Sequence, residues 1–326
     1  MWGFLVLFLT VPAFALPGFQ PAGGEAVPEP VRRAEASILK IYFPYYLTVK
    51  RAEAPALLTA TLLTAAGRQE IADCVNSKLE DCSIPLSFVE GTAFRDRRKE
   101  DALWTNCHLV DAWVRHQKYR AQIEGVNFRE RLKTSTIRAR VYDHRGTLLV
   151  DEADFRMEVA HVTEGDGPRS AGCVLADDAV RLLGPRVDRP ALPWAKTPAQ
   201  PGEATYIAGY PRQTDSRASM GAADSDGASF RWTLGALMGN AEFNQVLKAE
   251  NLPPEKYSFA RAGIYSLFMS NDGAEGMSGG PVLNAQGEVL GIFRGILPGP
   301  ITRAWPLATV GIQTDGLRYL EIRSGE

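Results

Sequence analysis

Short runs in which apolar and polar residues alternate are the clearest pattern along this chain. Residues 137–142 and 147–150 are two such runs, and they flank Asp143–Gly146, a sequence typical of a tight hairpin turn. Residues 154–159 alternate in the same way, and an apolar run at 37–42 opens the series. Because a period of two places alternate side chains on one face of a strand, these runs predict antiparallel strands of a barrel.

Two segments lack this alternation. Residues 54–79 and 240–250 are predicted to be helices, one before the segment that contains His108 and one in the C-terminal half. We therefore expect an all-β fold with a few inserted helices.

The glycine-rich sequence around Ser278 is the strongest chemical signal in the chain. Residues 276–281 read Gly-Met-Ser-Gly-Gly-Pro. Glycines allow the backbone to turn tightly and to present N–H groups, which are the donors that stabilise the oxyanion of an acyl-transfer intermediate. A serine is also an ordinary turn residue, so these six residues alone fit both a nucleophile and a plain turn.

Chain order separates two classes of hydrolase that share the pattern G-x-S-x-G. An α/β-hydrolase needs its catalytic histidine after the nucleophilic serine. The chain has four histidines, and all of them precede Ser278: His108, His116, His144 and His161. The order His, Asp, Ser of the chymotrypsin arrangement therefore remains.

The candidate base is His108, in the sequence Leu-Trp-Thr-Asn-Cys-His-Leu-Val at 103–110. This segment contains T-N-x-H-x-V, residues 91–94 match G-T-x-F, and residues 207–211 contain G-x-P. In this order, from about 90 to about 314, the motifs resemble those of trypsin-like serine proteases with the chymotrypsin fold. The likeness is strongest to the secreted bacterial branch with high-temperature-requirement and glutamyl endopeptidase-type catalytic domains.

The resemblance implies a serine endopeptidase that acts on polypeptides without a cofactor. It implies two antiparallel six-stranded β-barrels, one at about 37–190 and one at about 200–315, in a protease domain at 37–326. In such a domain His108 is the general base and Ser278 the nucleophile, and the N–H groups of Gly276 and Ser278 form the oxyanion hole.

Three aspartates are candidates for the acid of the implied His-Asp-Ser triad. Asp154 lies a whole strand too early and is interpreted as a surface carboxylate. Asp177 and Asp178 both lie at a distance from the G-x-P strand that resembles the family's spacing. Asp177 places Ala179 in the family's register, whereas Asp178 gives cleaner alternation along the following strand. Asp177 is preferred, and Asp178 is the alternative.

The residues of the implied substrate pocket leave its preference open. Asp272 lies six residues before Ser278, where trypsin-like enzymes carry the aspartate that binds Arg or Lys. Phe293 and Arg294 lie on a predicted strand that would wall the same pocket. Arg294 has the charge to pair with Asp272, and this pairing would cancel a preference for basic residues.

The N-terminus has the pattern of a secretory signal peptide. Residues 1–15 form an apolar stretch that ends in Ala-Phe-Ala, an A-x-A cleavage signal. Residues 16–36 are rich in Pro and Gly and are predicted to be a flexible lead-in. We expect export, to the periplasm or the exterior. About 48 residues follow Ser278, and we expect no C-terminal peptide-binding module among them.

Four cysteines in an exported chain predict disulfides, and three pairings are possible. Cys74 and Cys82 are close in sequence and would close a local loop. Cys107 adjoins His108, and Cys173 shortly precedes the candidate acids. Because the implied triad brings these flanks together, Cys107 is expected to pair with Cys173.

Composition and charge limit the partners. The formal net charge of -2 provides no basic field for nucleic acid. His and Cys show no metal-ligand spacing, so no metal is expected, and neither is a stable membrane span. We expect a monomer. The rival hypothesis is a protease-like binding module that has lost catalysis.

Overall fold

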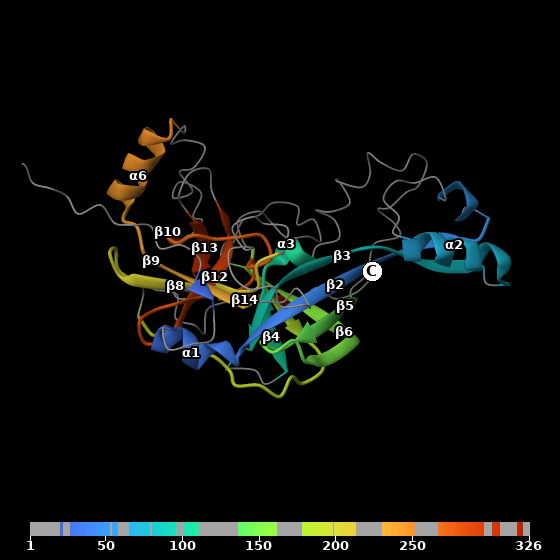
Figure 1. The fold of residues 1–326 in the computed structure, drawn as a ribbon, viewed down its shortest axis with the longest axis horizontal. Helices are drawn as coiled ribbons and strands as arrows, with labels where there is room; N and C mark the ends of the chain where they lie inside the picture. Colours follow the sequence, from blue (N-terminus) through green and yellow to red (C-terminus); the bar gives the residue numbers. More distant parts are fainter. Residues whose placement is uncertain are drawn as a thin grey trace, which may run out of the picture.

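Two antiparallel sheets form the body of the protein in the computed structural model (Figure 1). Their strands outnumber a few short helices, so the mostly β fold class predicted from the sequence is confirmed. The structure describes residues 20–21, 27–52, 54–57, 65–78, 80–95, 97, 101–110, 136–161, 178–197, 199–212, 230–251, 267–296, 302–306 and 318–321.

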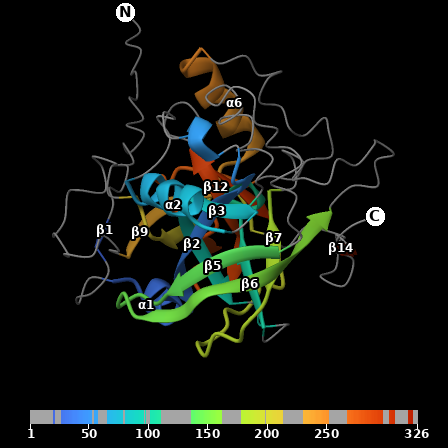
Figure 2. The ribbon, with the colours of Figure 1, turned by 90° about the vertical axis from the view of Figure 1, so that its right-hand side faces the viewer.

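Six strands in the N-terminal half close into a barrel. They are β2 (Ile38–Lys50), β3 (Asp81–Arg95), β4 (Ala102–Thr105), β5 (Thr136–Tyr142), β6 (Leu148–His161) and β7 (Val180–Leu183). They pair in the order β6-β5-β2-β3-β4-β7, and β6 also pairs with β7, which closes the ring. β14 (Arg318–Glu321) pairs with β6 as well. Figure 2 shows β5 and β6 side by side across this barrel.

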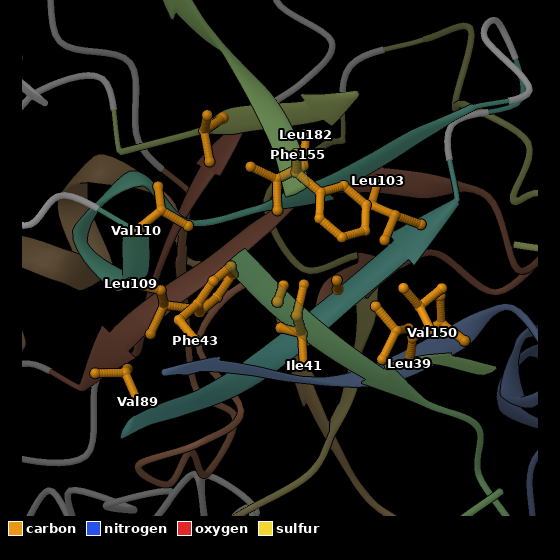
Figure 3. Packing of buried hydrophobic residues seen from close by; sticks show 14 of the residues in the cluster. Leu39, Ile41, Phe43, Val89, Leu103, Leu109, Val110, Val150, Phe155 and Leu182 are labelled. Atoms are coloured by element: carbon orange, nitrogen blue, oxygen red, sulfur yellow. The ribbon is translucent and has the colours of Figure 1, made fainter. Parts of the chain in front are cut away.

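Alternating side chains fill the first barrel. Leu39, Ile41 and Phe43 of β2 are at most 1% exposed, and they pack against residues of the other strands. Figure 3 shows these side chains converging with Phe155 of β6 and Leu182 of β7. In β6, Phe155 is buried between the exposed Asp154 and Arg156, as the predicted period of two requires. In β2, consecutive residues 37–41 are all buried, because Ile38 packs in a different apolar cluster from Leu39 and Ile41.

The second sheet comes mainly from the C-terminal half. It contains β1 (Gln20–Pro21), β8 (Ala204–Gly209), β9 (Arg231–Ala236), β10 (Leu267–Met269), β11 (Pro281–Leu283), β12 (Val289–Ile296) and β13 (Thr302–Pro306). The order is β1-β9-β8-β11-β12-β13-β10. A bridge between Leu237 and Met269 connects the end of β9 to the end of β10. The sheet therefore curls back on itself.

A shared apolar cluster joins the two barrels. It combines Ile38 and Trp104 of the first barrel with Leu283 and Ile292 of the second. Tyr210, which is 1% exposed, lies in the same cluster, and its hydroxyl donates to the Ile38 carbonyl at 3.0 Å. Burial raises the pKa of Tyr210 well above its usual value, so the phenol remains a neutral donor here.

The helices lie around the sheets. They are α1 (Glu29–Glu35), the 3-10 helix η1 (Ala54–Leu57), α2 (Ala65–Asn76), α3 (Cys107–Val110) and α6 (Asn240–Ala249). Among the described residues, no helix has the length and apolarity needed to cross a bilayer.

The predicted helices and lead-in differ from the structure in detail. The helix predicted at 240–250 corresponds to α6. Of the segment 54–79, the structure describes η1 and α2. The predicted lead-in at 16–36 contains α1, whose residues Val31 and Ala34 pack into the apolar cluster between the barrels. The proposed signal peptide at 1–15 lies outside the described residues.

Candidate active site

The ends of two paired strands bring His108 to a carboxylate. β4 ends at Thr105, and α3 begins two residues later and carries His108. β4 pairs with β7 so that Thr105 lies opposite Val180. The residue two positions before Val180 is Asp178, which therefore lies beside the start of α3.

Asp178 accepts two hydrogen bonds from His108. The Nδ1 atom of His108 lies 2.6 Å from Oδ2 of Asp178, and the His108 backbone N–H donates to Oδ1 at 2.8 Å. Asn106 Nδ2 donates to the Asp178 carbonyl at 2.7 Å. The Asp178 side chain is only 3% exposed, whereas that of His108 is 34% exposed. The carboxylate is therefore held inside, and the imidazole remains partly accessible.

This geometry bears on the acid candidates. The sequence register favoured Asp177, but the carboxylate that contacts His108 belongs to the alternative, Asp178. Asp177 lies outside the described residues. Asp154 is paired with Arg138 at an exposed position, as expected for a surface carboxylate.

Arg294 binds the same carboxylate. Its Nε atom lies 3.0 Å from Oδ2 of Asp178, and its side chain is 22% exposed. The sequence left open a pairing of Arg294 with Asp272, but the ion pair that the structure describes for Arg294 is with Asp178. The pairing depends on how closely β12 approaches the residue Asp178 before β7, which sequence spacing does not reveal.

The loop that carries Ser278 is anchored to the first barrel through Thr92. The Thr92 N–H donates to the Ser278 carbonyl at 2.8 Å, and the Thr92 hydroxyl donates to the Gly276 carbonyl at 2.9 Å. The same hydroxyl accepts the N–H of Tyr210 at 3.0 Å. One buried residue therefore fixes the loop at two points, through its backbone N–H and through its hydroxyl.

Two glycines of the loop are required by backbone geometry. Gly276 has φ +90° and Gly279 has φ +88°, a region that side chains with a Cβ rarely adopt. A Cβ on Gly279 would also collide with the Thr92 carbonyl and the Thr105 hydroxyl. Gly276 and Gly279 of the motif are therefore required by the backbone conformation of the loop.

The N–H groups of the loop divide into used and unused donors. Met277 donates to the Ala274 carbonyl, Gly279 to the Phe293 carbonyl and Gly280 to the Met277 carbonyl. For the N–H groups of Gly276 and Ser278, the described part of the chain offers no acceptor. These two unused N–H groups can receive an anionic oxygen.

The Ser278 hydroxyl donates to the Arg294 carbonyl at 3.0 Å. Ser278 is partly exposed, like His108. In this arrangement the hydroxyl proton of Ser278 is directed at the Arg294 carbonyl.

The other pocket candidates occupy different environments. Asp272 is partly buried, and its carbonyl accepts the Thr233 hydroxyl at 2.8 Å. Phe293 is fully buried in the second barrel, in one cluster with Met277. Phe293 therefore supports the serine loop by packing in the same apolar cluster as Met277.

The cysteines are only partly described. Cys74 and Cys107 are both disulfide-bonded, and no described cysteine is free. Cys173 and the side chain of Cys82 lie outside the described residues. The predicted pairing is therefore not tested.

Two contributors to the site were not identified from the sequence. Thr92 was noted only as part of a strand motif, although its position in that motif was the available signal. The contact of Arg294 with Asp178 left no local signal, because 116 positions separate the two residues.

Comparison with known proteins places these features in a family. The model of the trypsin-like peptidase domain matches residues 91–292. A search of curated proteins gave no match. Similar solved structures include the Rv3671c protease from M. tuberculosis in its active form, with 17% identity, 99% of this chain and 98% of that chain covered, and a TM-score of 0.44. The inactive form of the Rv3671c protease has 16% identity, 93% and 99% coverage, and a TM-score of 0.44. The serine endoprotease from Yersinia pestis has 14% identity, 85% and 61% coverage, and a TM-score of 0.42. The family match spans the segment from the G-T-x-F strand to β12, and the chain belongs to the trypsin-like peptidases, as a serine endopeptidase.

Proposed function

We propose that His108, Asp178 and Ser278 form the catalytic triad of this peptidase. The observation that carries the proposal is the 2.6 Å contact between His108 Nδ1 and the buried Asp178 carboxylate. A proton held on Nδ1 by this carboxylate leaves the lone pair of Nε2 available to accept a proton.

The reaction is hydrolysis of a peptide bond in two steps. The Ser278 oxygen attacks the peptide carbonyl carbon while His108 Nε2 takes the hydroxyl proton, and the N–H groups of Gly276 and Ser278 bind the resulting oxyanion. The imidazolium then protonates the leaving amine as the C–N bond breaks. Water, deprotonated by His108, releases the acyl group and restores the serine.

Covalent labelling tests the triad. A fluorophosphonate probe is expected to modify Ser278 in the wild-type protein and to leave Ser278→Ala unmodified. His108→Ala should lower the labelling rate by at least about 10³-fold, because the nucleophile loses its base. His144→Ala, in the hairpin turn after β5, is the matched control and should label at the wild-type rate. A folded wild-type protein that resists labelling would favour the binding-module hypothesis.

We propose a preference for Arg or Lys on the amino side of the cleaved bond, through Asp272. Support comes from its position six residues before Ser278 and from the engagement of Arg294 with Asp178. Ester substrates of Arg, Glu and Phe decide the preference. Arg should be cleaved fastest, and Asp272→Asn should reduce this advantage. A clear preference for Glu or Phe in the wild-type protein would reject the proposal.

We also propose that the protein is exported after removal of residues 1–15, with disulfides between Cys74 and Cys82 and between Cys107 and Cys173. The apolar leader and its A-x-A signal support export. N-terminal sequencing of the exported protein should begin at Leu16. Peptide mapping without reduction should find the two pairs, and a bond between Cys82 and Cys107 would contradict them.

A further inference from the structure

The carboxylate of Asp178 is shared between two nitrogen donors of different character. Oδ2 contacts both His108 Nδ1, at 2.6 Å, and Arg294 Nε, at 3.0 Å. The two nitrogens therefore lie within about 6 Å of one another. One donor belongs to an imidazole, which can accept a second proton, and the other belongs to a guanidinium that remains charged.

The burial of Asp178 makes this arrangement electrostatically strong. A carboxylate that is 3% exposed is costly without compensating charge, and the Arg294 guanidinium supplies this charge. The Arg294–Asp178 pair is neutral overall. A carboxylate without Arg294 would attract a second proton to the His108 ring much more strongly than this pair does.

The same residue also reaches the nucleophile. The Arg294 carbonyl accepts the Ser278 hydroxyl at 3.0 Å, and the Arg294 side chain binds Asp178. β12 therefore contacts both ends of the proposed triad through a single residue. Among the described residues of the site, the charged side chains that face His108 of α3 are Asp178, just before β7, and Arg294, on β12.

Resting on the proposed triad, we propose that Arg294 is a positioning residue that offsets the charge of Asp178 and thereby keeps His108 neutral to lower pH. Because peptide hydrolysis requires a neutral His108, Arg294 extends the activity of the enzyme toward acid. Its side chain binds the same Oδ2 atom as the imidazole and so orients the Asp178 carboxylate, and this fixes the ring that receives the serine proton.

The test is the pH profile of fluorophosphonate labelling in the full chain. This small probe reports on the Ser278–His108 pair and does not depend on the preference of the substrate pocket. Arg294→Gln keeps an N–H donor near Asp178 but loses the charge, Arg294→Met loses both, and Arg294→Lys keeps the charge. Arg140→Met removes an exposed arginine that pairs with Asp151 and Glu152, and it is the matched control.

Removal of the charge should move the pH midpoint of labelling upward. We expect a shift of about one pH unit in Arg294→Gln and Arg294→Met, since a charge within ~6 Å acts on a ring that is 34% exposed. Arg294→Lys and Arg140→Met should keep the wild-type midpoint. At high pH the labelling rate should fall further in Arg294→Met than in Arg294→Gln, because only glutamine keeps a donor.

The outcomes separate this proposal from the triad itself. If the wild-type protein does not label at any pH, the proposed triad is wrong. If the wild-type protein labels and both neutral variants keep its midpoint, the role of Arg294 is only structural and the inference fails. A shift in Arg294→Lys as large as that in Arg294→Gln would also overturn it. Thermal melting checks that each variant folds. The strand β12 is held by backbone hydrogen bonds, so replacing the side chain of Arg294 leaves its pairing in place.

Discussion

Asp143 and Asp178 are two buried aspartates with nearly the same surroundings and different consequences. Each side chain is 3% exposed, and each Oδ2 atom contacts one arginine, Arg189 at 2.6 Å and Arg294 at 3.0 Å. The Oδ1 atom of Asp143 accepts two backbone N–H groups, and that of Asp178 accepts one. Asp143 closes the turn between β5 and β6, whereas Asp178 also holds the ring of His108.

The difference lies in the kind of one partner. A buried carboxylate paired with arginine and with N–H groups is a structural arrangement, because every charge in it remains constant at neutral pH. When an imidazole replaces one N–H donor, the group includes a proton that can move. If that imidazole lies near Ser278, the same arrangement performs chemistry. Function therefore depends on what the carboxylate orients, and burial and pairing are common to both aspartates.

Asp178→Asn should have the largest effect on activity. An amide in place of the carboxylate no longer holds the proton on His108 Nδ1, so Nε2 loses its role as a base. We expect kcat/KM to fall by about 10⁴-fold, with KM nearly unchanged. Steady-state kinetics with an ester substrate measure this loss. A reduction of less than tenfold would show that another carboxylate completes the triad.

Asp143→Asn should lower the stability of the fold and leave activity nearly unchanged, in contrast to Asp178→Asn. The turn loses its charged pair with Arg189 and part of its N–H acceptance, and we expect the free energy of unfolding to fall by about 1–3 kcal/mol at pH 7. Activity per folded molecule should remain within about twofold of the wild-type value. Urea unfolding measures the stability. Asp154→Asn, at a site that is 60% exposed, is the control and should cost less than about 0.5 kcal/mol.

The contribution of Asp143 should also depend on pH, and this is the smallest predicted effect. Burial alone raises the pKa of Asp143, but the hydrogen bond from Arg189, the N–H groups of Thr147 and Arg145 and the charge of Arg189 bring it below its ordinary value of 3.8. A lowered pKa stabilises the fold above the ordinary value, and this stabilisation is lost as pH falls through the lowered one.

The stability difference between the wild-type protein and Asp143→Asn should therefore be constant near neutral pH and shrink below about pH 4. Urea unfolding at a series of pH values measures it. A difference that grows as the pH falls would contradict this account.

Much of the fold was predictable because alternation and turn chemistry act over short distances. The hairpin at Asp143–Gly146 forms as predicted, with Gly146 at φ +76° and its N–H bonded to the Asp143 carbonyl. α1 was missed because its burial depends on Val31 and Ala34 entering a cluster between two barrels, which a local pattern does not encode. A helical segment at 54–79 was predicted, and η1 and α2 lie within it.

The candidate site divides in the same way. Ser278 and its glycines were recognisable because the backbone of a tight loop places strict demands on residue type at consecutive positions. His108 was recognisable from the sequence at the end of a strand. The choice between Asp177 and Asp178 was not resolved, because neighbouring aspartates differ only in the direction in which each faces once β7 is paired with β4.

Local sequence thus determined the strand pattern, the turn glycines and the serine and histidine of the proposed triad, since each depends on neighbours along the chain. The folded chain alone decided that Asp178 meets His108 across 70 positions and that Arg294 meets Asp178 across 116. Such meetings depend on strand register and on the packing of one barrel against the other. A shift of one residue in the register of β7 or of β12 would place a different side chain at the position of Asp178 or of Arg294.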